Sequence, residues 1–260
     1  MKFRFGCAIS LALGCLYPVG DLHAAEGGAG VYLLGLRSSG AGFTPPPGLF
    51  FSDQLFMYNG SLEGRVELAG GVLAGGVDAD LIINIPTALW VTEAEIFGGR
   101  LGFSVTTPFG RTSVSGFVNP FGRTSDSVLT FGDPALTTFL GWNVGNFHIQ
   151  SGVTGYFPIG DYREAALANV ARHRLAADVY TAITWLDPEW GIDISNTIGV
   201  TFNAEHDETN YQTGTEFHWE WAVVKNFSPQ FSAGLNGYYY KQLTADSGSG
   251  KSPLIGDFKG

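Results

Sequence analysis

The sequence predicts an all-β fold: an antiparallel up-and-down transmembrane β-barrel with about 9–10 strands present, after an N-terminal signal peptide. Three observations favour it. Apolar and polar residues alternate in many segments, the connections alternate between long and short, and all six tryptophans fall toward short connections. Because the side-chain period of a strand is two, alternation separates an apolar face from a polar one. In an outer-membrane barrel these faces meet lipid and lumen.

Residues 1–25 have the organisation of a secretory signal, with a positively charged start and an apolar run that ends in small residues near Ala25. An uncleaved membrane anchor and a lipoprotein signal at Cys15 are the alternatives. Cys7 and Cys15 both lie in this segment, so cleavage leaves neither a disulfide nor a thiolate ligand. We expect the remainder, residues 26–260, to form one barrel domain that is incomplete at its C-terminus.

The composition narrows the possible partners. The formal net charge is −10, which disfavours nucleic acid because nucleic-acid binding needs a basic surface. Charged residues make up 15% of the chain, against about 25% in ordinary globular proteins. Beyond the N-terminal signal there is no apolar run long enough for a transmembrane helix. The apolar residues must therefore be spread thinly, and alternation along strands achieves this.

The strand predictions follow from the alternation. Six segments alternate clearly: 77–85, 147–155, 174–185, 192–203, 216–224 and 230–240. Three weaker candidates are 49–59, 95–107 and 127–142. Together they predict nine strands, with "SPLIGDFKG" as the start of a tenth.

The connections alternate in length, as the short periplasmic turns and longer outside loops of outer-membrane barrels do. The long connections are 60–76, 108–126, 158–174, 204–214 and the tail after residue 243. The short ones are 91–94, 143–146, 186–191 and 225–230. In one long connection, "YREAALANVARH" has helical spacing, which predicts a short loop helix over 162–173.

The tryptophans lie toward the short-turn end, where an amphipathic ring suits the lipid–water boundary. They are Trp90, Trp142, Trp185, Trp190, Trp219 and Trp221. Such a girdle supports the barrel, although tryptophans filling a soluble core are the alternative.

The segment "EFHWEWAVV" shows how the two faces are assigned. Phe217, Trp219 and Trp221 alternate with ionisable residues, and an ionised carboxylate in hydrocarbon is costly. The aromatic face is therefore assigned to lipid and the ionisable face to a wet lumen. By the same reasoning we expect the following residues to line the lumen and set its selectivity: Asp78, Asp80, Asn84, His148, Asp178, Glu216, His218 and Glu220.

The sequence contains none of the common catalytic or nucleotide-binding motifs. Two strand faces, "DAD" at 78–80 and "EFHWE" at 216–220, carry groups suited to metal binding or acid–base chemistry. A hydrated lumen wall is the simpler interpretation, because alternation generates such sets in any barrel. We therefore expect no catalytic residues, no metal and no cofactor.

Several motifs resemble those of SphA-like proteins in the "meta-pathway of phenol degradation" family: "PPPGLFFSDQLFMYNG", "FGDPALTTFLGWN", "GYFPIGDYREAALANVARHR", "YQTGTEFHWEWAV" and "GLNGYYYKQLT". The resemblance runs from about Gly27 to the end and is most specific over 131–244. It implies an outer-membrane β-barrel linked to catabolism of aromatic compounds. It also implies further strands beyond "IGDFKG", so we expect about three strands of a barrel of about 12 to be missing.

The resemblance implies an outer-membrane channel that takes up small hydrophobic or aromatic compounds, contacting outer-membrane lipid in a Gram-negative bacterium. Two alternatives remain open. One is a barrel with a lipid-hydrolase site, for which His148 and His218 are the in-strand histidines available as a base. The other is a secreted β-sandwich with a binding role.

Overall fold

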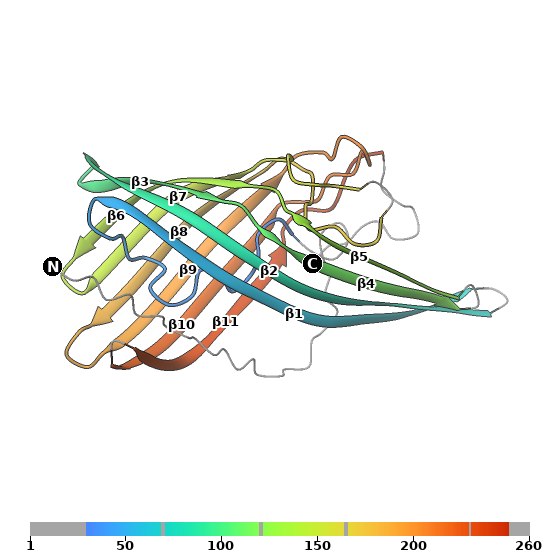
Figure 1. Ribbon diagram of the computed structural model, residues 1–260, viewed down its shortest axis with the longest axis horizontal. Helices are drawn as coiled ribbons and strands as arrows, with labels where there is room; N and C mark the ends of the chain where they lie inside the picture. The colour runs from blue at the N-terminus through green and yellow to red at the C-terminus, as the bar shows by residue number, and fades with distance from the viewer. Residues whose placement is uncertain (1–29, 69–70, 120–121, 164–165, 229, 250–260) are drawn as a thin grey trace.

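The computed structural model describes residues 30–68, 71–119, 122–163, 166–228 and 230–249. The signal-peptide prediction and the start of a tenth strand lie outside these residues. Every regular element described is a β-strand, and all belong to one sheet (Figure 1). Within the described part of the chain, no helix has the length and apolarity needed to cross a membrane.

Eleven strands make up this sheet. They are β1 (Gly48–Leu68), β2 (Gly71–Ile96), β3 (Gly99–Thr106), β4 (Phe109–Asn119), β5 (Gly122–Phe131), β6 (Ala135–Val144), β7 (Phe147–Tyr156), β8 (Ala176–Asp187), β9 (Ile192–Asn203), β10 (Glu216–Ser228) and β11 (Phe231–Gln242). All pairings are antiparallel, and strands neighbouring in sequence are mostly neighbours in the sheet, as the up-and-down prediction requires.

Two pairs of these strands are halves of longer ones. The same edge of β2 pairs with β3 near one end and with β4 near the other, and β5 and β6 continue each other in the same way. Pro108 and Pro134 stand at the two interruptions, where a residue without a backbone N–H cannot continue the ladder. Counting each pair once gives nine long strands, which confirms the number predicted from alternation.

The hairpins β1–β2 and β4–β5 project well beyond the ends of β8 to β11 (Figure 1). The prediction of loops at 60–76 and 108–126 was therefore wrong, since most of these residues pair as strands. Their glycine-rich, polar sequences are typical of loops, but each hairpin partner supplies the missing backbone hydrogen bonds. The predicted short turns at 143–146 and 186–191 do connect neighbouring strands. The turn predicted at 91–94 was wrong, because these residues lie within β2 and the connection to β3 is at residues 97–98.

The loop helix expected over 162–173 is also absent from the described residues of that segment. Instead, the Asp133 carboxylate accepts hydrogen bonds from the backbone N–H groups of Arg172 and His173, both at 2.7 Å. These tertiary bonds hold the loop in an irregular path and override the helical spacing of its side chains.

The two faces of β8, β9 and β10 differ as the alternation predicted. Residues of one parity are buried, and those of the other are half-buried or exposed. Ile198, for example, is 52% exposed, whereas Thr197 and Asp178 are fully buried. A soluble sandwich would bury its large apolar face, so this inverted arrangement is that of a barrel wall. Within the described residues β1 pairs only with β2 and β11 only with β10, so the sheet is not closed.

A segment that precedes the first strand lies against the inward face of the sheet. This inner segment, residues 30–47, has no regular structure but hydrogen-bonds to inward-facing side chains of β6 to β10. No pattern in the sequence predicted this inner segment. Its apolar and polar contacts define the candidate site.

Candidate functional site

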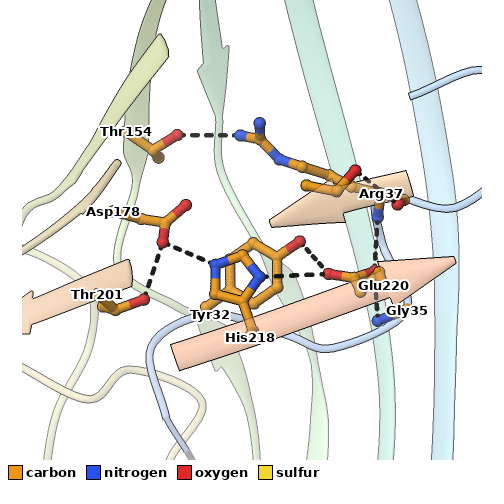
Figure 2. Close-up of polar contacts among 9 residues, drawn as sticks. Tyr32, Gly35, Arg37, Thr154, Asp178, Thr201, His218 and Glu220 are labelled. Atoms are coloured by element: carbon orange, nitrogen blue, oxygen red, sulfur yellow. Dashed lines mark hydrogen bonds and ion pairs between the residues drawn. The ribbon is translucent and has the colours of Figure 1, made fainter. Parts of the chain in front are cut away.

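Glu220 on β10 is the main anchor of the inner segment (Figure 2). Its carboxylate accepts hydrogen bonds from the backbone N–H of Gly35 at 2.9 Å and of Arg37 at 3.1 Å, and from the hydroxyl of Tyr32. Glu220 is 1% exposed. Three donors converging on one buried carboxylate satisfy it well, because hydrogen bonds to an ionised acceptor are the strong ones.

His218 links this anchor to the next strands. Its Nε2 lies 2.8 Å from Oδ1 of Asp178 on β8, and its Nδ1 lies 3.8 Å from Oε1 of Glu220. The Tyr32 ring stacks on the imidazole at a centroid distance of 3.9 Å (Figure 2). Thr201 donates a further hydrogen bond to Asp178 at 2.9 Å. The result is a buried polar cluster that spans β8, β9 and β10.

Arg37 carries the positive charge of the inner segment into this cluster. Its guanidinium lies over the Tyr180 ring, 3.3 Å from the centroid, and donates to Thr154 Oγ1 at 3.1 Å. A guanidinium held over an aromatic face is attracted by the negative face of the ring. The positive charge of Arg37 thus lies near the acidic side chains of the inner wall, while its guanidinium contacts Tyr180 and Thr154.

The inner segment continues along the wall past this cluster. Ser39 donates to Asp193 at 2.8 Å, and the backbone N–H of Gly42 donates to Thr184 at 3.0 Å. A Cβ built at Gly42 would come within 2.3 Å of the His148 carbonyl oxygen and 2.7 Å of the Thr184 nitrogen. Only glycine lets the chain approach the wall this closely.

A cavity of about 240 Å³ lies between the inner segment and the other side of the sheet. Leu33 and Leu36 of the inner segment face it, together with Leu81, Ile83 and Ile85 of β2. Its polar lining includes the following side chains from the segment and the strands: Tyr32, Arg37, Gln54, Thr87, Ser104, Thr106, Thr112, Thr137, Thr154 and Tyr156. The site therefore combines an apolar surface with hydroxyl groups.

The residues that the sequence placed in the lumen fall into three groups. Asp178, His218 and Glu220 come together in the polar cluster described above. Glu216 lies one inward position away and accepts from Asn203 at 2.8 Å and from Tyr240 at 2.7 Å.

His148 is buried but separate from that cluster. Its Nδ1 is 2.7 Å from Oδ1 of Asn143, and Phe43 of the inner segment meets its ring edge-on at 5.1 Å. It thus contacts the same inner segment, further along the wall.

Asp78, Asp80 and Asn84 form the third group, and for them the predicted face was wrong. Ile83 and Ile85 of the same strand are buried and line the cavity, whereas Asp80 and Asn84 are exposed on the opposite face. Leu33 and Leu36 of the inner segment line the same cavity as this apolar face of β2.

The outward carboxylates of β2 have polar partners. Asp78 lies 3.6 Å from the Arg123 guanidinium and accepts a hydrogen bond from Ser115 at 3.3 Å. Asp80 accepts a hydrogen bond from Asn59 on β1. These residues belong to the projecting hairpins, where the outward face carries polar groups.

His218 and His148 are the two histidines that the sequence offered as a base for a hydrolytic site. Both ring nitrogens of His218 face carboxylates, and His148 bonds to an amide. In the described residues neither of these two histidines has a serine as hydrogen-bond partner. The described residues also contain no group of three His, Cys, Asp or Glu suited to a metal ion.

Comparison with known proteins places this sheet in a family. The family model described as "Putative MetA-pathway of phenol degradation" matches residues 65–260. The chain belongs to this family. A solved structure, the COG4313 outer membrane channel from Pseudomonas putida F1, aligns with a TM-score of 0.61 at 16% identity, covering 80% of this chain and 77% of that one. No curated protein matches the chain.

The family match begins at residue 65, after the inner segment, whereas the resemblance was expected from about Gly27. Sequence reasoning missed Tyr32, Arg37 and the cavity. The segment has no strand periodicity and its contacts are separated by more than 100 residues in sequence. One signal was available: residues 30–43 are rich in glycine, and the triple proline at 45–47 precedes the first strand. A segment of this kind has no regular structure of its own and is held by hydrogen bonds to the strands.

Proposed function

We propose that this chain is an outer-membrane channel for uptake of small hydrophobic or aromatic compounds, serving phenol degradation. Membership of the phenol-degradation family supports the metabolic link. The antiparallel sheet and its likeness in fold to an outer membrane channel support the location in the membrane. The exposed apolar rows of β8 to β10 suit contact with lipid, because barrel walls alternate apolar outward and polar inward.

One observation supports hydrophobic compounds as the substrate class. The cavity behind the wall is lined by branched aliphatic side chains from β2 and the inner segment, with hydroxyl groups among them. Apolar pockets with a few placed polar groups are the usual sites for small organic ligands. A wholly polar lumen would instead favour ions and sugars, so the β2 wall points to hydrophobic cargo.

A non-enzymatic role fits the site better than hydrolysis. His218 lies between Asp178 and Glu220, and the resulting cluster holds the inner segment. A secreted sandwich is disfavoured by the exposed apolar rows.

Permeation of vesicles tests the proposal. The full chain reconstituted in lipid vesicles is expected to admit phenol and toluene faster than empty vesicles. Ile83→Trp should slow this entry several-fold, because the indole ring is larger than the isoleucine side chain and fills the cavity. Ile82→Trp is the matched control, since its side chain is 54% exposed on the opposite face. Equal permeation by protein-containing and empty vesicles would remove the channel proposal.

A further inference from the structure

Arg37 of the inner segment has no ion-pair partner within the described residues, although it lies against the inward face of the sheet. Its guanidinium donates to Thr154 Oγ1 at 3.1 Å and lies over the Tyr180 ring. Neither of these partners is a carboxylate. Charged side chains held away from bulk water are usually paired, because an unpaired charge is costly to desolvate. The charge of Arg37 therefore calls for an anionic partner.

The carboxylates of the polar cluster are bonded to other donors. Asp178, which pairs with Thr154 across β7 and β8, bonds through Oδ1 to His218 and Thr201. Its Oδ2 is buried without a hydrogen bond and forms no ion pair with Arg37. Glu220 accepts the backbone N–H of Arg37 and not the guanidinium. Neither carboxylate lines the cavity, so the guanidinium keeps donors for a group inside it.

Tyr156 places a hydroxyl beside this guanidinium. It lies two residues beyond Thr154 on β7, so the two side chains leave the same face of the strand. Its hydroxyl makes no hydrogen bond within the described residues, and it is not one of the buried atoms sealed from solvent. Arg37 and Tyr156 are both half-buried and both line the cavity. A molecule in the cavity can therefore reach both groups.

The rest of the lining sets the charge and character of a ligand. Arg37 and Arg172 bring two positive charges to it, and Asp133 brings one negative charge. The Asp133 carboxylate is already bonded to the backbone N–H groups of Gly160, Arg172 and His173. Aliphatic side chains of β2 and of the inner segment complete the lining. A matching ligand has a small apolar body and one negatively charged group.

We propose that this cavity binds a small aromatic carboxylate, with Arg37 and Tyr156 donating hydrogen bonds to the carboxylate oxygens. The planar guanidinium matches the geometry of a carboxylate, and hydrogen bonds between charged partners are the strong ones. The ring of the ligand lies along the aliphatic side chains of β2. This inference rests on the proposed uptake function and adds to it a class of anionic cargo that the apolar β2 wall alone would not select.

Binding of benzoate and of benzamide to the detergent-solubilised full chain, measured by titration calorimetry, tests the site. The two molecules have nearly the same shape, but only benzoate is charged, so benzoate should bind about tenfold more tightly. Arg37→Met keeps an unbranched side chain and the backbone N–H that bonds to Glu220. It should weaken benzoate binding about tenfold and benzamide binding far less, because one charge-assisted hydrogen bond is lost.

Tyr156→Phe tests the second donor from the wall, without altering the inner segment. It should weaken benzoate binding about fivefold and change benzamide binding less. Arg123→Met is the matched control, because Arg123 lies on the projecting hairpin with its side chain 61% exposed beside Asp78. Removing the same charge there should change neither affinity.

Equal affinities of the unaltered chain for benzoate and benzamide would overturn the carboxylate site. So would benzoate binding that survives both Arg37→Met and Tyr156→Phe. If Arg37→Met weakens both molecules alike, Tyr156→Phe decides: a selective loss of benzoate supports the site, and an equal loss of both molecules refutes it.

Permeation keeps this site and the channel apart. Vesicles that admit phenol and toluene, with a chain that binds benzoate no better than benzamide, would keep the channel and remove the site. Vesicles that admit neither faster than empty ones, with selective benzoate binding intact, would remove the channel and keep the site.

Discussion

The two walls that face the inner segment are built differently. The wall of β7 to β10 presents Asp178, His218 and Glu220, and it holds the segment through directed hydrogen bonds. The wall of β2 and β4 presents Leu81 and Ile83, and it leaves a cavity. The same strand periodicity produces both walls, but the polar and apolar faces are exchanged.

In both walls the inward face matches the part of the inner segment that it faces. Polar inward faces have their groups satisfied by backbone N–H groups and hydroxyls of the inner segment. Apolar inward faces line the cavity together with the leucines of the same segment. The segment therefore separates an anchored side from a side with room for a ligand.

The largest effect is expected from a charge on the outward face of the anchored wall. Ile198 lies in the middle of β9 and is exposed outward, so Ile198→Arg places a cation against lipid. Such a substitution costs about 2–4 kcal/mol near the bilayer midplane. We expect a large loss of folded protein in the outer-membrane fraction and a lower urea midpoint.

Ser127→Arg provides the matched comparison on the projecting hairpins. Ser127 is exposed on β5 beside Asp78, Asp80 and Asp126, where an added cation meets water and carboxylates. This variant should assemble as the wild type does. Equal losses for the two substitutions would contradict the view that the hairpins leave the membrane.

The sequence predicted the inward face of the β8 to β10 wall better than that of the β2 wall. Alternation identified the buried polar face of β8 to β10 because apolar residues there have only lipid to contact. The same rule failed for Asp78, Asp80 and Asn84, because a strand with a polar and an apolar face can be turned either way. Its orientation depends on what lies inside, and the inner segment has no periodic pattern.

A smaller and more local effect is expected from the anchor. Glu220→Ala removes the acceptor of the Gly35 and Arg37 N–H groups and of the Tyr32 hydroxyl. Each unpaired buried donor costs about 1–3 kcal/mol, so residues 32–37 should leave the wall while the sheet remains folded. Hydrogen exchange should be faster at the amides of Gly35 and Arg37 and unchanged in β9.

Glu220→Gln sharpens this test, because the amide oxygen still accepts hydrogen bonds but carries no charge. Exchange at Gly35 and Arg37 should then rise less than in Glu220→Ala. Unchanged protection in Glu220→Ala would contradict the assignment of Glu220 as the main anchor of the inner segment.

The smallest effect distinguishes the corrected orientation of β2 from the predicted one. Asp80→Asn alters an outward carboxylate on a projecting hairpin, so the cation-to-anion permeability ratio of the channel should stay within experimental error. Glu216→Gln removes a buried inward charge of the anchored wall and should lower that ratio. Reversal potentials in a salt gradient measure both. If Asp80→Asn gave the larger shift, its carboxylate would have to face the ion path, and β2 would be turned with its aspartates inward after all.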